Sequence, residues 1–287
     1  MLGFRQVSLV VVRIGQWAKR GRRCAGGTPR PSRPGTTRLR LMIIGFCGSG
    51  NMAAAIARGW AGSWREMLFS DADPGKAHAL AGELGGEAVG SNGELAERAD
   101  VVLLAVKPGA LQQAASELAG AESVISILGA TPLENVQAAF PNAEVGRVMP
   151  NVAVEVGGGV LCVAGEFSPG VREKLSALGS VVELPDSQFD VATALMACSP
   201  AYFALVAEAL ADAGVSAGLD EKLVEKLVVE AAAGAGSLMR IRRPADVRVS
   251  VTSPGGSTEA GLDALDREGA RAAFQAAVRA SLERMRG

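Results

Sequence analysis

Short apolar runs alternate with longer amphipathic runs between residues 41 and 185 of the chain. The apolar runs have the length of buried strands, whereas the longer runs repeat their apolar positions as helices do. We predict strands at residues 41–46, 66–71, 99–106, 122–128, 143–149, 159–165 and 180–184. Because strands that alternate with helices form mostly parallel sheets covered on both faces, this region predicts a doubly wound α/β domain.

The pattern changes after Pro185, where the strand-like runs stop and helical composition continues to the C-terminus. The segment 218–220 separates two helical runs, and both are apolar around more of their circumference than a lone surface helix. Burial against a second copy of the chain explains these faces most simply, which predicts a homodimer or a higher homo-oligomer built from dimers. We therefore predict an all-helical dimerisation domain over residues 188–287, after an α/β domain over residues 42–187.

The composition is that of a folded protein without a nucleic-acid surface. The 287 residues are 48% hydrophobic and 4% aromatic, with a net charge of −1, which argues against disorder and against a basic, aromatic-rich binding face. The apolar run Val7–Ile14 is much shorter than the roughly 20 residues of a membrane span. We expect a cytoplasmic protein with no nucleic-acid partner, no membrane partner and no membrane helix elsewhere.

The first 41 residues differ from the rest, because residues 1–40 carry ten Lys and Arg residues and no Asp or Glu. Met42 stands directly before the first strand motif. We expect residues 1–41 to be a basic leader or disordered tail that is not part of the fold. An organelle-targeting segment and a tail that contacts an anionic partner are the alternatives.

The cysteines and the single histidine form no pattern of metal ligands or of a nucleophile with its base. Cys24, Cys47, Cys162 and Cys198 lack ligand spacing, and His78 has no partner in sequence. We therefore expect no metal site, free thiols and an exposed histidine.

A glycine-rich turn follows the first predicted strand and opens the first helix. Gly48, Gly50 and Ala53 have the spacing of a dinucleotide fingerprint, and Gly45 precedes them. The glycines allow a tight turn and the close approach of a pyrophosphate to the helix N-terminus. The turn predicts a Rossmann-like domain.

An acidic cluster lies where a carboxylate binds the ribose of NAD. Asp71 and Asp73 fall about 20 residues beyond the fingerprint, at the position that contacts the 2′-hydroxyl. No arginine is adjacent, but Ser70 and Lys76 could contact a 2′-phosphate, and the aspartates could instead cap the next helix. The choice between NADP(H) and NAD(H) stays open.

Three other segments carry candidate ligand contacts. Val106, Lys107 and Pro108 end one strand, and residues 147–151 end another, at the edge where open α/β sheets bind ligands. The stretch Val251–Leu262, VTSPGGSTEAGL, breaks the helical domain and offers N–H groups and hydroxyls at a new helix start, which suits a small carboxylate. Each segment could instead be a structural turn or cap.

The segments IGFCGSGNMAAAI, AVKP, RVMPN, SPAY and VTSPGGST, in this order, resemble the pyrroline-5-carboxylate reductase family from residue 42 to about residue 285. The resemblance implies an oxidoreductase that transfers hydride from NAD(P)H to the cyclic imine 1-pyrroline-5-carboxylate and gives L-proline in proline biosynthesis. It also implies a Rossmann domain joined to a helical dimerisation domain. Each substrate pocket would lie between the nucleotide domain of one subunit and the helical segment of its partner.

The resemblance implies a role for each motif. The phosphates and ribose would be held by Gly48, Ser49, Gly50, Asn51 and Met52, to which the fingerprint adds Gly45 and Asp71. The nicotinamide would be framed by Lys107, Pro108, Met149, Pro150 and Asn151, with Val106 beside them. The substrate would be bound by Ser253, Gly255, Gly256, Ser257 and Thr258. Thr258, facing the ring nitrogen, and Lys107 would be the catalytic residues.

The absence of a usable histidine fits imine reduction, which needs no strong acid–base pair and depends mainly on the orientation and proximity of hydride donor and acceptor. Two departures bear on the pocket. The family usually has Gly-Ser-Gly where this chain has Ala197-Cys198-Ser199, and Thr-Pro where it has Val152-Ala153. The alternatives are a reductase of another cyclic imine or small carbonyl acid, and a nucleotide-binding relative without turnover.

Overall fold

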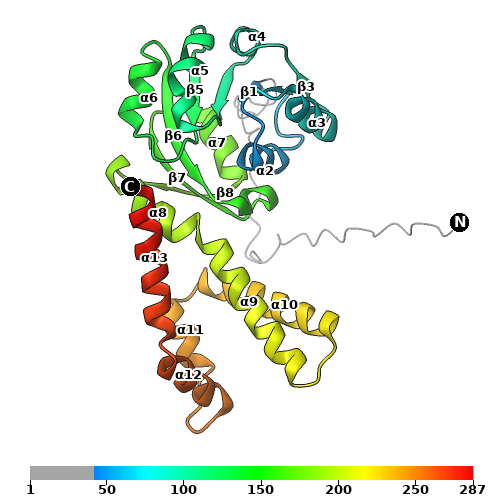
Figure 1. Cartoon of the computed structure of the whole chain (residues 1–287), viewed down its shortest axis with the longest axis vertical. Coiled ribbons are helices and arrows are strands. Elements are labelled where there is room, and N and C mark those ends of the chain that lie inside the picture. Colours follow the sequence, from blue (N-terminus) through cyan, green and yellow to red (C-terminus); the bar gives the residue numbers. More distant parts are fainter. Residues whose placement is uncertain (1–41, 287) are drawn as a thin grey trace, which may run out of the picture. The chain divides into compact units, whose positions relative to one another are not determined.

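The computed structural model describes residues 42–286. The leader predicted over residues 1–41 lies outside the described residues. The chain forms one eight-stranded sheet in the order β3-β2-β1-β4-β5-β6-β7-β8, followed by helices alone (Figure 1). Its strands are β1 Ile43–Cys47, β2 Glu66–Ser70, β3 Glu87–Ala88, β4 Val101–Leu104, β5 Ser123–Ser126, β6 Glu144–Pro150, β7 Gly159–Gly165 and β8 Gly179–Glu183.

The sheet confirms the predicted doubly wound α/β class. All neighbouring strands are parallel except β6 and β7, which pair antiparallel. The sequence pattern missed β3, which has two residues and therefore no periodicity to detect. Because β1, β2 and β4 to β6 run in one direction, their carboxyl ends share one edge of the sheet.

Helices cover both faces of the sheet, and a separate hydrophobic core lies on each face. One face packs α2 Asn51–Gly59, α3 Pro74–Leu84 and α7 Pro169–Ala177 around Trp60, Phe46 and Phe69. The other packs α4 Asn92–Arg98, α5 Leu111–Glu117 and α6 Leu133–Ala139 around Leu95 and Leu104. The strand order proceeds from β1 outward to β3 on one side and from β4 outward to β8 on the other. The glycine-rich turn after β1 therefore lies near the middle of the sheet.

Local signals explain where these helices begin and end. The Asp73 carboxylate caps α3 by accepting a hydrogen bond from Gly75 N at 3.0 Å, and Pro74 suits the first turn because it has no N–H to satisfy. Gly85 ends the helix in the left-handed conformation, with φ of 71°. Ser91 caps α4 in the same way through Glu94 N.

The C-terminal region is helical, as predicted. Its helices are α8 Phe189–Met196, α9 Ser199–Ser216, α10 Glu221–Met239, α11 Pro244–Ser250, α12 Ser257–Arg267 and α13 Ala270–Arg286. The segment 217–220 separates α9 from α10, and the Asp220 carboxylate caps α10. The turn 251–256 separates α11 from α12, so VTSPGGST breaks the helices where the sequence indicated.

Few side chains of these helices are buried within a single chain. On α9 no residue is buried, and on α10 only Val224 is. By length and composition, the helical run 186–216 could cross a membrane, with 6% of its apolar window buried. Length and composition alone are weak evidence for a membrane span, so the expectation of no membrane helix stays a prediction.

Candidate functional site

The loop after β1 has a conformation that only glycine accepts at residue 48. Gly48 has a φ of +101°, and a Cβ there would lie 2.6 Å from the carbonyl oxygen of Ala105. Its N–H donates to the Ser70 carbonyl at 2.8 Å. The turn is therefore held against the ends of both β2 and β4, which brings the segments after three strands together.

The start of α2 is open toward solvent. Gly50 is the N-cap and provides no side-chain cap, and nothing lies within 4 Å of where its Cβ would be. Asn51 is exposed and Met52 half-buried, whereas Ser49 is buried and its Oγ has no hydrogen-bond partner. A helix N-terminus without its own cap, beside room for a ligand, fits the pyrophosphate of a dinucleotide.

Asp71 is fixed beside this loop by two backbone hydrogen bonds. Its Oδ2 accepts from Ser49 N at 2.7 Å, and its Oδ1 accepts from Asp73 N at 2.9 Å. The carboxylate therefore lies at the carboxyl end of β2, the location expected for a ribose contact.

Asn92 is a polar residue near this edge that the sequence analysis missed. Its Oδ1 accepts from Ser70 Oγ at 2.8 Å and from Cys47 Sγ at 3.4 Å, and its Nδ2 donates to Glu117 at 2.6 Å. Its place after the helix cap Ser91 gave no sign of these contacts, because they depend on the neighbouring β1 and β2.

The Cys47 thiol lies under the same edge, and its pKa is far above the ordinary value. Burial, and to a smaller extent the nearby carboxylates of Glu117 and Asp71, disfavour the thiolate and together raise the pKa of Cys47 from 9.0 to about 12. The thiol stays protonated at neutral pH, so it acts as a weak donor to Asn92 and not as a nucleophile.

Gly45 requires a correction. It lies inside β1, as the predicted strand 41–46 had it, and pairs with Leu68 and Val102. A Cβ at Gly45 would lie 2.8 Å from Leu95 Cγ and 3.0 Å from Ala99 Cβ. Its small size therefore serves the packing of α4 against the sheet, and we withdraw it from the cofactor-binding set.

The residues predicted around the nicotinamide divide into an exposed and a buried group. Lys107 and Pro108 are exposed, and Val106 is half-buried, where the chain leaves β4 for the short 3₁₀ helix Pro108–Ala110. Met149 and Pro150 are buried at the end of β6. Met149 packs with Cys162 and Phe189, so it contacts the start of the helical region.

Asn151 uses both ends of its side chain within the protein. Its Nδ2 donates to the Met196 carbonyl at 3.1 Å, and its Oδ1 accepts from Val160 N at 3.1 Å. It thereby ties the end of β6 to the C-terminus of α8, next to the altered segment Ala197-Cys198-Ser199. In this arrangement the amide orients backbone instead of pointing into open space.

Arg147 makes a second link between the sheet and the helices that the sequence did not reveal. It is 3% exposed, its Nη1 lies 2.7 Å from Asp186 Oδ1, and its guanidinium lies 4.5 Å from the centre of the Phe189 ring. Asp186 also accepts from Leu133 N. The pair joins residues 39 positions apart, and local sequence patterns do not indicate contacts over such a separation.

The predicted substrate-binding segment VTSPGGST leads into α12, and one of its N–H groups already binds a carboxylate of the chain. Gly255 has a φ of +71° with open space around it, and its N–H donates to Glu259 Oε2 at 2.7 Å. Ser253, Ser257 and Thr258 are exposed. Among the described residues, no hydrogen bond or ion pair joins this segment to the sheet. Glu259 was missed, although a Glu three residues after the N-cap Gly256 is a capping-box position.

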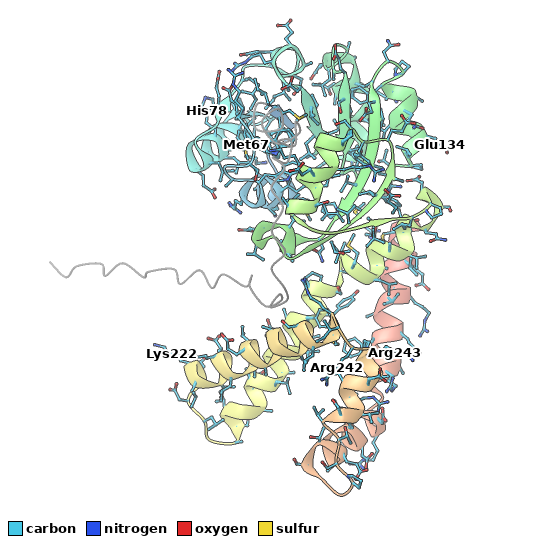
Figure 2. The ribbon with its side chains drawn as sticks, turned by 180° about the vertical axis from the view of Figure 1, so that it is seen from behind. Met67, His78, Glu134, Lys222, Arg242 and Arg243 are labelled. Carbon is cyan, nitrogen blue, oxygen red and sulfur yellow. The ribbon has the colours of Figure 1, made fainter. Side chains whose placement is uncertain are left out.

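His78 lies on α3, as labelled in Figure 2, and is exposed as predicted. Its Nδ1 lies 2.7 Å from the Pro74 carbonyl oxygen within the same helix. It has no contact with the loop after β1, so the described part of the chain provides no imidazole for proton transfer at that edge.

Comparison with known proteins identifies the family. A family model described as pyrroline-5-carboxylate reductase dimerisation matches residues 186–287, and one described as NADP oxidoreductase coenzyme F420-dependent matches residues 43–129. Pyrroline-5-carboxylate reductase of Synechocystis sp. is 37% identical over 204 residues, which cover 67% of this chain and 76% of that protein. The chain belongs to the pyrroline-5-carboxylate reductase family. The family's dimerisation model starts at Asp186, the residue paired with Arg147.

Other members agree with this assignment. The enzyme of Thermus thermophilus is 37% identical over 194 residues, covering 65% of this chain and 74% of the relative. The crystal structure of Plasmodium falciparum pyrroline carboxylate reductase, with NADP bound, superposes with a TM-score of 0.76 at 26% identity, covering 86% of this chain and 97% of that one. The likeness therefore includes both the sheet and the helical region.

Proposed function

We propose that this chain is an NAD(P)H-dependent oxidoreductase that reduces 1-pyrroline-5-carboxylate to L-proline. One observation carries the proposal. The same chain has a glycine-rich loop that leads into an uncapped helix N-terminus, and it has the helical dimerisation region of this reductase family. NADP(H) is the cofactor supported by the bound NADP of the Plasmodium relative and by the NADP oxidoreductase model. The cofactor supplies the hydride when it is bound.

The residues around the loop after β1 fit such a cofactor. Gly48, Gly50 and the first turn of α2 would hold the pyrophosphate, and Asp71 would contact the adenosine ribose. Lys107 and Pro108 are exposed at the same edge of the sheet and would lie beside the nicotinamide. Met149 and Asn151 would act less directly, by fixing the end of β6 against α8.

The turn before α12 would bind the substrate carboxylate. Its Gly255 N–H donates to the Glu259 carboxylate in the single chain, and a substrate carboxylate would take the place of Glu259 at this donor. Thr258 would face the ring nitrogen and hold its proton while Ser253 and Ser257 complete the polar surround. Because a protonated imine accepts hydride without a strong acid, this sparse set suffices.

A second subunit would complete the site. Large apolar side chains stay exposed along α9 and α10 in the single chain: Phe203, Leu205, Leu210, Leu223, Leu227 and Val229. The apolar run that could cross a membrane by composition lies in the same region, within the residues matched by the dimerisation model. We infer a homodimer, or a larger oligomer of dimers, in which one subunit's α12 turn meets its partner's nucleotide domain.

We place the boundary between the two domains near residue 188 and the enzyme in the cytoplasm. The Ala197-Cys198-Ser199 segment favours keeping a second candidate, reduction of another cyclic imine or small carbonyl acid, because extra side chains lie where the family usually has glycines.

The test is NAD(P)H oxidation by the purified full chain with 1-pyrroline-5-carboxylate and with other cyclic imines. We expect turnover with 1-pyrroline-5-carboxylate, and in Thr258→Ala a loss of kcat of about 10²-fold, the range for a positioned polar group in proton transfer. Ser216→Ala, at the far end of α9, serves as the control and should retain activity. Nucleotide binding without turnover on any imine would support a non-catalytic relative and overturn the proposal.

A further inference from the structure

The carboxylate of Asp71 is held in one position beside the nucleotide loop. It accepts from Ser49 N at 2.7 Å and from Asp73 N at 2.9 Å, so both of its oxygens are anchored to backbone. Moving the carboxylate away would leave the Ser49 N–H and the Asp73 N–H without this acceptor, which disfavours the movement. A ligand must therefore accommodate this charge where it stands.

A second carboxylate occupies the neighbouring helix start. Asp73 caps α3 by accepting from Gly75 N at 3.0 Å. The N-terminus of α3 would otherwise attract an anion, because its first N–H groups and its dipole favour negative charge. The chain's own carboxylate fills that position, so this helix start does not offer a phosphate site.

The arginines of α2 and α4 do not offset these two charges, because both are held in ion pairs with glutamates. Arg58 is paired with Glu83 and Glu155, and Arg98 with Glu66, Glu87 and Glu94. Between residues 71 and 84 the one Lys or Arg is Lys76, which is exposed on α3. One solvated lysine stands against two carboxylates anchored to backbone.

We propose that Asp71 makes the ribose 2′-hydroxyl the preferred group at this site, so that NADH binds more tightly than NADPH and serves as the better reductant. This inference rests on the proposed function and ranks its two nucleotides. A fixed carboxylate accepts hydrogen bonds from the ribose hydroxyls, whereas a 2′-phosphate at the same place brings a dianion against Asp71 and Asp73. Both nucleotides share the loop after β1, so NADPH still binds, with lower affinity.

The experiment measures the binding of NADH and NADPH to the full chain by isothermal titration calorimetry at low and moderate salt. For the unmodified chain we expect the Kd of NADH to be lower than that of NADPH by about tenfold or more. Raising the salt should narrow the ratio, since the repulsion of the 2′-phosphate is screened.

Asp71→Asn removes the charge and keeps an amide oxygen as an acceptor. We expect the difference between the Kd values of NADH and NADPH to disappear in this variant, because NADPH binding strengthens relative to NADH binding by about tenfold. Asp100→Asn is the matched control, because Asp100 also accepts a backbone hydrogen bond from β1, at 2.7 Å from Ile43 N, but at the opposite end of the strand. It should keep the ratio of the unmodified chain.

The outcomes separate the inference from the function. Equal affinities, or tighter NADPH binding, in the unmodified chain would overturn the inference while leaving the reductase proposal standing, and this comparison needs no variant. A ratio in Asp71→Asn equal to that of the unmodified chain would overturn the assignment to Asp71. If neither nucleotide binds, the proposed function fails together with the inference.

Discussion

At the scale of single residues, the carboxyl edge of the sheet is organised by short-range polar contacts that fix charge and protonation. Ser49 N binds Asp71, Ser70 Oγ binds Asn92, and the same amide accepts from Cys47. These contacts hold a negative charge and a neutral thiol within one small area. The thiol offers a direct check on this arrangement, because its ionisation responds to both burial and the carboxylates.

Cys47 should resist alkylation in the folded protein. Its pKa is raised to about 12 from 9.0, so at pH 8 the native thiolate is rarer than in the unfolded chain by about 10³-fold. Peptide mapping after timed iodoacetamide treatment should show Cys198, which is half-buried, modified well before Cys47. Equal rates at the two cysteines would contradict the buried, hydrogen-bonded thiol.

The same shift predicts how stability depends on pH. Because the pKa of Cys47 is higher in the folded state, the native chain keeps a proton that the unfolded chain has lost between pH 9.0 and about 12. Its contribution is fully present below pH 9.0 and is lost as the pH rises toward 12. Urea unfolding of Cys47→Ala should therefore show a weaker loss of stability over this interval than the unmodified chain.

At the scale of elements, the strand–turn–helix unit β1–α2 determines where a nucleotide can bind. Its geometry rests on one left-handed residue, Gly48, which touches the end of β4, and on the open start of α2 at Gly50. The lack of a side chain at Gly59 lets helix α2 pack close to η2 Val152–Val156. A Cβ at Gly59 would lie 2.2 Å from the Val154 carbonyl oxygen. The unit is therefore held at its turn and at the C-terminal end of α2.

Gly48→Ala should abolish tight nucleotide binding. A methyl group would meet the Ala105 carbonyl at 2.6 Å in a backbone conformation that costs an L-residue about 1–3 kcal/mol, so the loop must move. Calorimetric titration with NADH should show at least about a tenfold weaker Kd.

Gly62→Ala is the matched control for that substitution. Gly62 also has a positive φ, of +72°, but nothing lies within 4 Å of its Cβ position. It should lose a little thermal stability and keep its affinity for NADH. Similar losses of affinity in both variants would show that backbone strain alone, and not the shape of the loop, accounts for the effect.

At the scale of the whole molecule, the helical region leaves large apolar side chains exposed that a soluble single chain would bury. Leu227 on α10 is 52% exposed and Phe203 on α9 is 69% exposed. Together with the match to a dimerisation model, this surface indicates that the functional unit contains at least two chains.

Leu227→Asp should therefore lower the molar mass in solution. Light scattering after size exclusion should give a multiple of 29.3 kDa for the unmodified chain and a shift toward 29.3 kDa for the variant, with reductase activity lost in parallel. Val156→Asp, at an exposed apolar residue of the sheet domain, should leave the mass unchanged. A single-chain mass for the unmodified protein that retains activity would refute the shared site.

The sequence by itself determined the fold class, the seven longer strands and the position of the nucleotide loop, because periodicity and glycine spacing are local properties of the chain. It also located the break at VTSPGGST, since a proline followed directly by two glycines strongly disfavours a continuous helix. Only the tertiary structure decided that Gly45 packs against α4, that Asp71 is anchored to Ser49, and that Asn151 and Arg147 bind α8 and Asp186. These contacts join residues distant in sequence, so their partners are specified only when the sheet order brings the strands together.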